Sequence, residues 1–261
     1  MARAIWSGAI SFGLVNVPVK LVTAVSPKDI RFNQLEAATG QRVKQKRVSA
    51  VTGEEVPYDQ IVKGYEIAPD QYVVVTPEEL AALDPKATHT IDIEDFVELA
   101  QIDPIYFEHA YYLVPETAGR KAYALLVETM TRTGKVAIAR LVLRTKQYLA
   151  CIRPLAHALV LETLYYADEV VPVSEIDVPR DVEVSERELE VARQLVEALT
   201  TDFDPARYHD TYREQVMALI EAKAAGRQVV AQVPAAEEEG AVVDLMAALE
   251  RSLETVRAKG A

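Results

Sequence analysis

The first two thirds of this 261-residue chain is a series of short segments rich in β-branched and aromatic residues, separated by glycine and proline. Such segments favour β-strands, and Gly and Pro mark the turns between them. Residues 4–23 predict two strands joined near Gly13. Further strands are predicted at residues 30–35, 71–76, 109–114, 135–145, 148–154 and 157–166. This many strands with short connections indicates a barrel or sandwich rather than a parallel sheet.

Two helices are predicted among the strands. Pro77–Leu83 follows Thr76, a good N-cap residue with Glu79 three positions later. Residues 121–133 form the second helix, and Gly134 follows its end. Its apolar face carries Tyr123, Leu126, Val127 and Met130.

The last third changes to helical periodicity. Ser185 and Glu188 form a capping box that opens one helix, and Asp204 with Pro205 predicts the start of another that ends at Gly226. Residues 226–240 have the composition of a linker, and an amphipathic helix is expected from about residue 242 to 257. A helix separated from the core in this way needs a partner surface to be stable.

The charge is unevenly distributed along the chain. The formal net charge of −12 argues by itself against nucleic-acid binding. However, residues 120–153 hold eight basic residues and one acidic residue, whereas residues 162–261 hold 10 basic and 22 acidic residues. Because salt screens charges over about 8 Å at physiological ionic strength, a concentrated basic face attracts a polyanion even when distant surface is acidic.

Two basic clusters predict contacts with phosphate. In an extended segment, Arg140, Arg144 and Lys146 share one face, and the two arginines are about 13 Å apart at about 3.3 Å per residue. That spacing suits phosphates along a duplex. The neighbouring helix extends this surface with Arg120, Lys121, Arg132 and Lys135. The second cluster is Arg42, Lys44, Lys46 and Arg47. In an extended segment, alternation places Arg42, Lys44 and Lys46 on one face.

Each basic cluster has a simpler alternative interpretation as a solvated edge strand that its charges protect from pairing. However, two basic clusters without compensating acid occur in an otherwise acidic chain. This favours a surface that binds phosphate over a solvated edge strand. Aromatic residues make up only 7% of the chain, so contact with a duplex backbone is expected rather than base stacking.

The motifs of common enzymes are missing from the sequence. There is no phosphate-binding loop and no GxGxxG, and the four histidines lack metal-ligand spacing. Cys151 lies in an apolar strand pattern typical of a buried thiol. We expect no catalytic residue, cofactor, metal or membrane segment, and with one cysteine, a cytoplasmic location. Two alternatives remain: a metal-dependent nuclease or phosphohydrolase that uses the acidic stretch 92–98, or a scaffold that does not bind DNA.

Several motifs in order resemble those of the bacterial Ku proteins. The first is the opening AIWSGAISFGLVNVPVK at residues 4–20, and the motifs together are far more specific than any one of them. The others are residues 61–66, 102–107, 121–126, 133–155 and 166–170. The likeness spans about residues 3–225, and residues 242–246 resemble the short C-terminal segment of the family.

The resemblance implies a mixed β plus α fold and a role in non-homologous end joining. Its β-barrel core forms half of a ring that encircles DNA, and a helical arm grips a second copy. Such a homodimer binds double-stranded DNA ends and recruits a multifunctional ATP-dependent DNA ligase. On this basis we expect a core and bridge in residues 1–180, a dimerisation arm in 181–225, a linker in 226–240 and a ligase-docking helix in 241–261.

The resemblance also assigns candidate residues. The ring lining is expected to include Arg140, Arg144, Lys146 and Arg153 with the 42–47 cluster. The dimer candidates are Tyr208, Tyr212, Val216, Leu219 and Ile220, and the ligase-docking candidates are Val243, Leu245, Met246 and Leu249.

Two departures from the family pattern affect these expectations. Residues 49–52 read SAVT where some relatives carry CxxC, so a metal knuckle is not expected there. Other relatives end in a lysine-rich tail, whereas this sequence ends at Ala261 with Arg257 and Lys259 nearby. We therefore expect less tail-assisted movement along DNA.

Overall fold

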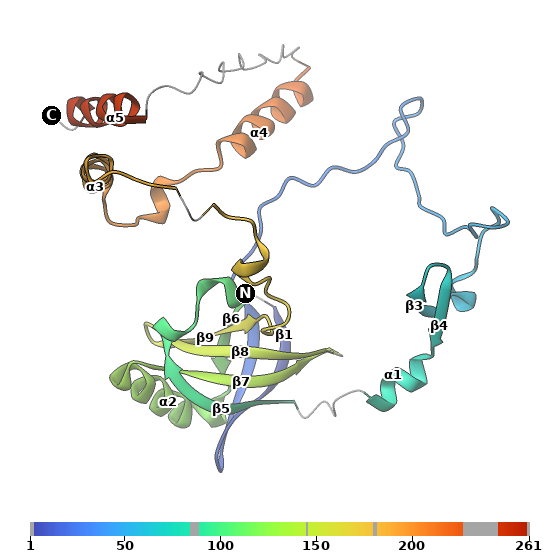
Figure 1. The fold of residues 1–261 in the computed structure, drawn as a ribbon. Coiled ribbons are helices and arrows are strands. Elements are labelled where there is room, and N and C mark those ends of the chain that lie inside the picture. The colour runs from blue at the N-terminus through green and yellow to red at the C-terminus, as the bar shows by residue number, and fades with distance from the viewer. Residues whose placement is uncertain (1–2, 84–88, 145, 180–181, 227–244, 260–261) are drawn as a thin grey trace. The chain divides into compact units, whose positions relative to one another are not determined.

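The structure is a computed structural model that describes residues 3–83, 89–144, 146–179, 182–226 and 245–259 (Figure 1). It divides into two compact units, Met1–Glu175 and Ile176–Ala261, which are considered separately below. Within the described residues, no helix has both the length and the apolar character needed to cross a bilayer.

Seven strands of the first unit form a closed barrel in the order β1-β2-β6-β9-β8-β7-β5 (Figure 1). Neighbouring strands are antiparallel except for β1 and β5, which are parallel. The strands are β1 (Ala4–Phe12), β2 (Val15–Thr23), β5 (Thr90–Glu98), β6 (Phe107–Pro115), β7 (Lys135–Leu143), β8 (Lys146–Leu155) and β9 (Ala158–Leu164). The predicted β-barrel is therefore confirmed, and β5 is a strand that the sequence pattern did not indicate.

Alternating side chains fill the barrel. Val17, Val19 and Leu21 of β2 point inward and are almost fully buried, as are Ala137 and Ala139 of β7. Helix α2 (Arg120–Thr133) packs against β2, β7 and β8. It closes the core with the predicted face of Tyr123, Leu126, Val127 and Met130. Gly134 ends the helix at φ 65°, in the left-handed region that favours glycine.

Tyr123 ties α2 to two strands of the barrel. Its hydroxyl donates a 2.7 Å hydrogen bond to the carbonyl of Leu113 on β6 and accepts one of 2.7 Å from the amide of Leu159 on β9. Leu113 and Leu159 are partners in the β6–β9 ladder. Burial raises the pKa of the Tyr123 phenol, so this hydroxyl stays protonated and holds the helix where the two strands meet.

The barrel closes on its shortest ladder. Strands β1 and β5 pair at only three positions, from Ala9 with Thr90 to Ser11 with Asp92. The amide of Ala9 also donates a 2.9 Å hydrogen bond to the carbonyl of His89. A Cβ atom on Gly8 would lie 2.1 Å from that carbonyl oxygen, so the close approach of the two segments requires glycine at this position.

A long excursion, residues 24–89, leaves the barrel after β2 and returns at β5. It contains a separate two-stranded sheet of β3 (Lys63–Ala68) and β4 (Gln71–Val75), followed by α1 (Pro77–Leu83). The predicted cap of α1 is confirmed, because the Glu79 amide donates to Thr76 Oγ1 at 3.2 Å and the Thr76 amide donates to the Glu79 carboxylate at 2.8 Å.

The strand predicted at residues 30–35 is wrong. The chain there is irregular and exposed, apart from one isolated bridge between Leu35 and Arg42. Its apolar residues Phe32 and Leu35 are exposed and so gain little from burial. A segment with apolar and aromatic residues becomes a strand only when another strand is placed to pair with it.

The second unit is helical. α3 (Glu186–Leu199) begins with the predicted capping box of Ser185 and Glu188. α4 (Thr211–Ala224) begins later than predicted, because Asp204 and Pro205 open only a single 3₁₀ turn, Pro205–Arg207. α5 (Leu245–Lys259) packs against α3. Nearly all of the predicted linker, and residues 242–244 of the predicted final helix, lie outside the described residues.

Candidate nucleic-acid interface

The first basic cluster, Arg42, Lys44, Lys46 and Arg47, is exposed in the excursion. It does not form the expected strand: bridges occur only at Arg42 and at Val48. Lys46 pairs with Glu55 at 2.5 Å, and the Arg47 guanidinium lies 5.3 Å from the centre of the Tyr58 ring. Within the described part of the chain, Arg42, Lys44 and Arg47 have no carboxylate partner. Their charges are therefore available to an anion.

The basic residues of α2 lie at its two ends. Arg120 and Lys121 form the exposed first turn, which contains no acidic residue. Cations are unfavourable there, because the N-terminus of a helix is already positive. The turn is held close to β2, since a Cβ atom on Gly119 would lie 2.9 Å from the Pro18 ring. Arg132, in the last turn, pairs with Glu128 at 2.7 Å. The first turn is thus the part of α2 suited to a phosphate.

Arg140 lies on the outer wall of the barrel, between the buried residues Ala139 and Leu141 of β7. In the β5–β7 ladder it is opposite Asp92, and its Nε is 3.2 Å from a Glu94 oxygen. Glu94 is the extra residue of a bulge, because Ile93 and Asp95 of β5 face consecutive residues of β7.

Lys135 begins β7 and pairs with Glu98, at the end of β5, at 2.9 Å. This lysine, through its hydrogen bond and then its charge, lowers the pKa of the Glu98 carboxyl. Both β7 cations therefore meet a β5 carboxylate.

Arg144 and Lys146 do not share a strand with Arg140, contrary to the prediction. β7 ends at Leu143, and Arg144 adopts φ 60° in the turn that leads to β8. Lys146 opens β8, where its Nζ is 3.7 Å from Glu169 and 5.1 Å from the centre of the Tyr148 ring. The turn breaks the even-residue alternation, so these two cations lie at the end of the barrel rather than on the outer face of β7.

Arg153 makes a two-point ion pair that is less exposed than the pairs of Lys135, Arg140 and Lys146. Its Nε and Nη2 donate hydrogen bonds of 2.8 and 2.9 Å to the two oxygens of Glu162 on β9. Only 27% and 15% of these side chains are exposed. Chiefly through its hydrogen bonds, Glu162 raises the pKa of Arg153. Beside them, burial raises the pKa of Cys151 to about 12, as expected for the predicted buried thiol.

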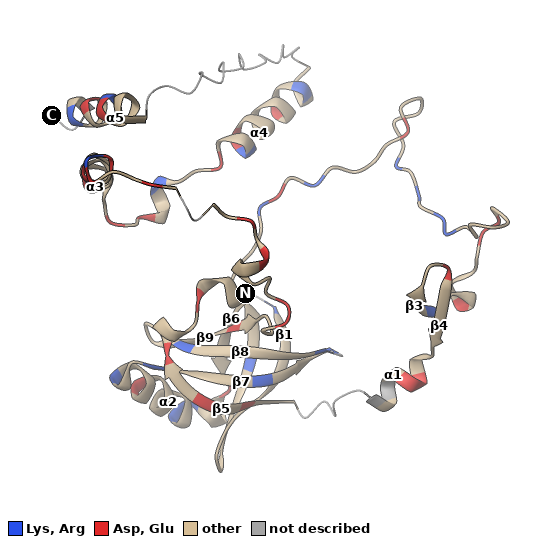
Figure 2. Ribbon diagram, in the orientation of Figure 1, with Lys and Arg blue, Asp and Glu red and all other residues tan. Residues whose placement is uncertain are grey.

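The predicted cations on the barrel strands are therefore each paired with a carboxylate, and Figure 2 shows both charges on these strands. Sequence reasoning found the cations and missed their partners: Glu94, Glu98, Glu162 and Glu169. No local pattern identifies these partners, because the pairs on the strands depend on which strands are neighbours and in which register.

The acidic stretch 92–98 does not form a metal cluster. Asp92 and Glu94 lie beside Arg140, and Glu98 pairs with Lys135. No group of three or more His, Cys, Asp or Glu within the described residues could hold a metal ion. The nuclease alternative therefore has no ligand set at this position.

The predicted dimer residues lie on and before α4. Tyr212 and Ile220 are exposed on the helix, and Val216 and Leu219 are half-buried. Tyr208 precedes the helix and stacks on Phe203, with ring centres 5.9 Å apart. α4 thus presents exposed aromatic and aliphatic side chains.

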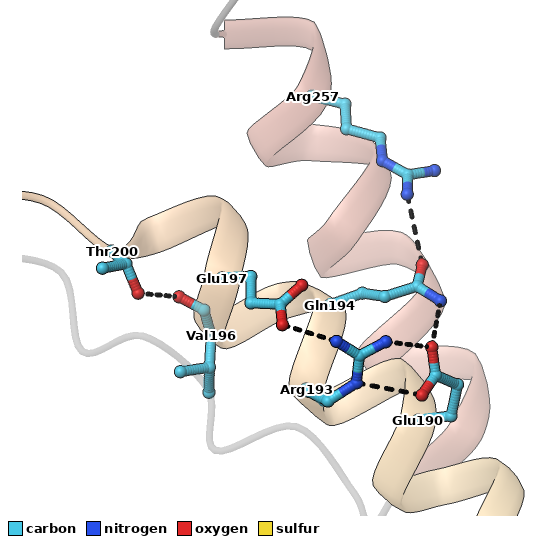
Figure 3. Close-up of polar contacts among 7 residues, drawn as sticks. All are labelled: Glu190, Arg193, Gln194, Val196, Glu197, Thr200 and Arg257. Carbon is cyan, nitrogen blue, oxygen red and sulfur yellow. Dashed lines mark hydrogen bonds and ion pairs between the residues drawn. The ribbon is translucent and has the colours of Figure 1, made fainter.

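The predicted ligase-docking helix, α5, lies against α3 (Figure 3). Leu253 is only 7% exposed, Met246 and Leu249 are half-buried, and Leu245 is exposed. Val243 lies outside the described residues. Arg257 donates a 3.2 Å hydrogen bond to Gln194, and Arg187 pairs with Glu250 at 3.2 Å.

A polar network on α3 supports this contact. Arg193 lies between Glu190 and Glu197, and Gln194 donates a 3.0 Å hydrogen bond to Glu190 (Figure 3). Hydrogen bonds from Arg193 and Gln194 lower the pKa of Glu190 to about 2. Gln194 therefore links the network to α5 through Arg257.

Comparison with known proteins identifies the family. The Ku70/Ku80 β-barrel domain family matches residues 11–191, which run from the end of β1 through the rest of the barrel and the excursion to the start of α3. The chain belongs to the Ku family. The predicted resemblance to Ku is thereby confirmed.

Curated Ku relatives match along nearly the whole chain. A Non-homologous end joining protein Ku of Anaeromyxobacter sp. (strain K) is 53% identical, over 100% of this chain and 88% of its own length. The protein of the same description from Pseudomonas aeruginosa is 44% identical, over 97% and 88%. That of Frankia casuarinae is 43% identical over 98% of this chain, which spans 64% of that longer Ku protein.

Proposed function

We propose that this chain acts in non-homologous end joining as a homodimeric ring that binds double-stranded DNA ends and recruits an ATP-dependent DNA ligase. The observation that carries the proposal is the Ku family match over residues 11–191, together with relatives described as end-joining proteins along nearly the whole chain. The chemistry of joining belongs to the ligase, so no catalytic residue is required of this chain.

The first candidates for phosphate contacts are the basic side chains that lack a carboxylate partner among the described residues. They are Arg42, Lys44 and Arg47 in the excursion, Arg120 and Lys121 at the start of α2, and Arg144 in the β7–β8 turn. The paired cations Lys46, Arg132, Lys135, Arg140, Lys146 and Arg153 contact DNA only by exchanging a carboxylate for a phosphate. Contacts of this kind carry no base information, so binding is expected to be independent of sequence and strongly weakened by salt.

In the proposed ring, the helical unit contacts the second copy of the chain and the ligase. The exposed Tyr208, Tyr212 and Ile220 would be covered by a second copy of the chain. Exposed aromatic side chains are enriched at protein interfaces. α5, which includes Leu245, Met246 and Leu249, would dock on the ligase.

The test is binding of purified protein to linear and covalently closed circular duplexes of identical sequence. A ring admits DNA only at an end, so we expect retention of the linear form and little of the circle after a brief rise in salt. Equal retention of both forms would contradict the ring. Absence of binding at low salt would favour the scaffold alternative, and metal-dependent cleavage would favour a nuclease.

A further inference from the structure

Every predicted DNA-binding cation on the barrel strands faces a glutamate. Lys135 and Arg140 of β7 meet carboxylates of β5, Arg153 of β8 meets one of β9, and Lys146 meets one in the segment after β9. A phosphate that approaches any of these four cations must therefore compete with a carboxylate that is already in place. The strength of that competition differs from pair to pair.

The Arg140–Glu94 ion pair is weak enough for Arg140 to exchange the carboxylate for a phosphate. One nitrogen of Arg140 contacts one oxygen of Glu94 at 3.2 Å, and 52% and 41% of the two side chains are exposed. Exposed ion pairs of this kind are weak, because water and salt screen them. By contrast, Arg153 makes two short hydrogen bonds to Glu162 in a site that is largely shielded from solvent.

The position of Glu94 in the strand points to a specific role. It is the extra residue of the β5 bulge, so it has no direct partner in the β7 ladder. A bulge re-aims the side chain that it carries. Here the carboxylate is brought beside Arg140, which already has Asp92 opposite it in the ladder.

We propose that Glu94 competes with DNA phosphate for Arg140 and so limits the affinity of the ring for duplex DNA. The inference rests on the proposed function, in which Arg140 contacts the phosphate backbone. When Arg140 turns to a phosphate, Glu94 loses its partner and is left close to the negative DNA. Both effects oppose binding and weaken the grip of the ring on any one stretch of duplex.

The substitution Glu94→Gln removes the competing charge and keeps the shape of the side chain. We expect duplex affinity to rise about two- to fivefold per subunit, the range that an exposed ion pair is able to oppose. The slope of log affinity against log salt should steepen by about 0.9 for each phosphate that becomes fully neutralised.

The matched control is Glu250→Gln. It makes the same change in net charge and breaks an exposed ion pair of the same length, Arg187–Glu250 at 3.2 Å, on helices that are not assigned to DNA. Fluorescence anisotropy with a hairpin-blocked linear duplex, over a series of salt concentrations, would compare the full-length proteins. Thermal melting by circular dichroism would check that each variant is folded.

The decisive step is to repeat Glu94→Gln in an Arg140→Gln background. The inference predicts that the gain in affinity seen with Glu94→Gln exceeds that of Glu250→Gln and disappears when Arg140 is absent. A gain no larger than that of the control, or one that persists without Arg140, would overturn it. If the unaltered protein fails to bind the duplex, the proposed function itself is overturned. If the unaltered protein binds and Glu94→Gln leaves the affinity unchanged, only this inference is overturned.

Discussion

Arg153 and Glu162 form a two-point ion pair across strands β8 and β9, with hydrogen bonds of 2.8 and 2.9 Å. Because 27% or less of each side chain is exposed, the pair is shielded from the salt that weakens the other ion pairs of the wall. We therefore expect Arg153 to stabilise the barrel and to contribute less to DNA affinity than Arg140.

The change Glu162→Gln should lower the free energy of unfolding by about 1–3 kcal/mol, since it leaves a shielded guanidinium without its carboxylate. Urea denaturation followed by circular dichroism measures this. Glu250→Gln, which breaks an exposed pair, should lower it by about 0–1 kcal/mol. Equal effects of the two changes would show that the shielding of Arg153 has no energetic consequence.

The change Tyr123→Phe should destabilise the barrel without altering its shape. It removes the hydroxyl that accepts from the Leu159 amide and donates to the Leu113 carbonyl, and both groups are buried with it. Leaving buried polar groups unsatisfied costs about 1–3 kcal/mol each, so for the two groups we expect a loss of about 2–6 kcal/mol in urea denaturation. Tyr148→Phe is a suitable control, because the described residues include no hydrogen bond of the Tyr148 hydroxyl. A loss of less than about 1 kcal/mol would mean that water replaces the hydroxyl.

The excursion cluster should contribute to DNA binding in proportion to its free charges. Changing Arg42, Lys44 and Arg47 to Gln together should weaken binding to duplexes of any sequence by a similar factor. The salt slope should become shallower by about 0.9 for each phosphate that the variant no longer neutralises, or about 2.7 for three. The control removes the same amount of charge at Arg187, Arg251 and Arg257. A sequence-dependent weakening, or an equal weakening in the control, would argue against phosphate binding by this cluster.

The α3 network predicts a stability change with pH. The pKa of Glu190 is lowered from 4.5 to about 2, chiefly by the hydrogen bond from Arg193 and next by that from Gln194. A lowered carboxyl pKa stabilises the folded state above the unfolded value, and this stabilisation is lost as pH falls from about 4.5 to about 2. Glu190→Gln should therefore melt at a lower temperature than the parent at pH 6, and the difference should vanish near pH 2. A difference independent of pH would assign the effect to packing.

Local patterns in the sequence predicted the local features of the fold. The turn after β1, the buried face of α2 and the caps of α1 and α3 all depend on residues within a few positions of one another. Strand β5 was missed because its acidic outer positions resemble an exposed loop. Its inward residues Ile91 and Ile93 indicate a strand only once it is known that β5 pairs with β7.

The sequence predicted the basic residues of the candidate site, but it did not predict the carboxylates with which they pair. The cations of the barrel wall stand out because they occur in a segment poor in acid, but their partners come from other strands or loops. Glu94 reaches Arg140 only because a bulge shifts the β5–β7 register. The irregular path of residues 24–62 was equally beyond prediction from β-propensity, since nothing in the local sequence says that no strand will pair with it.

The three-position ladder between β1 and β5 has a mechanical consequence. The excursion re-enters the barrel at His89, whose carbonyl is bonded to Ala9, and the next residue begins that ladder. If DNA pulls on the excursion in the proposed ring, the β1–β5 ladder is the barrel ladder next to the point of re-entry. We expect this ladder to separate before the others when the excursion is pulled, because it has the fewest paired positions of the seven barrel ladders.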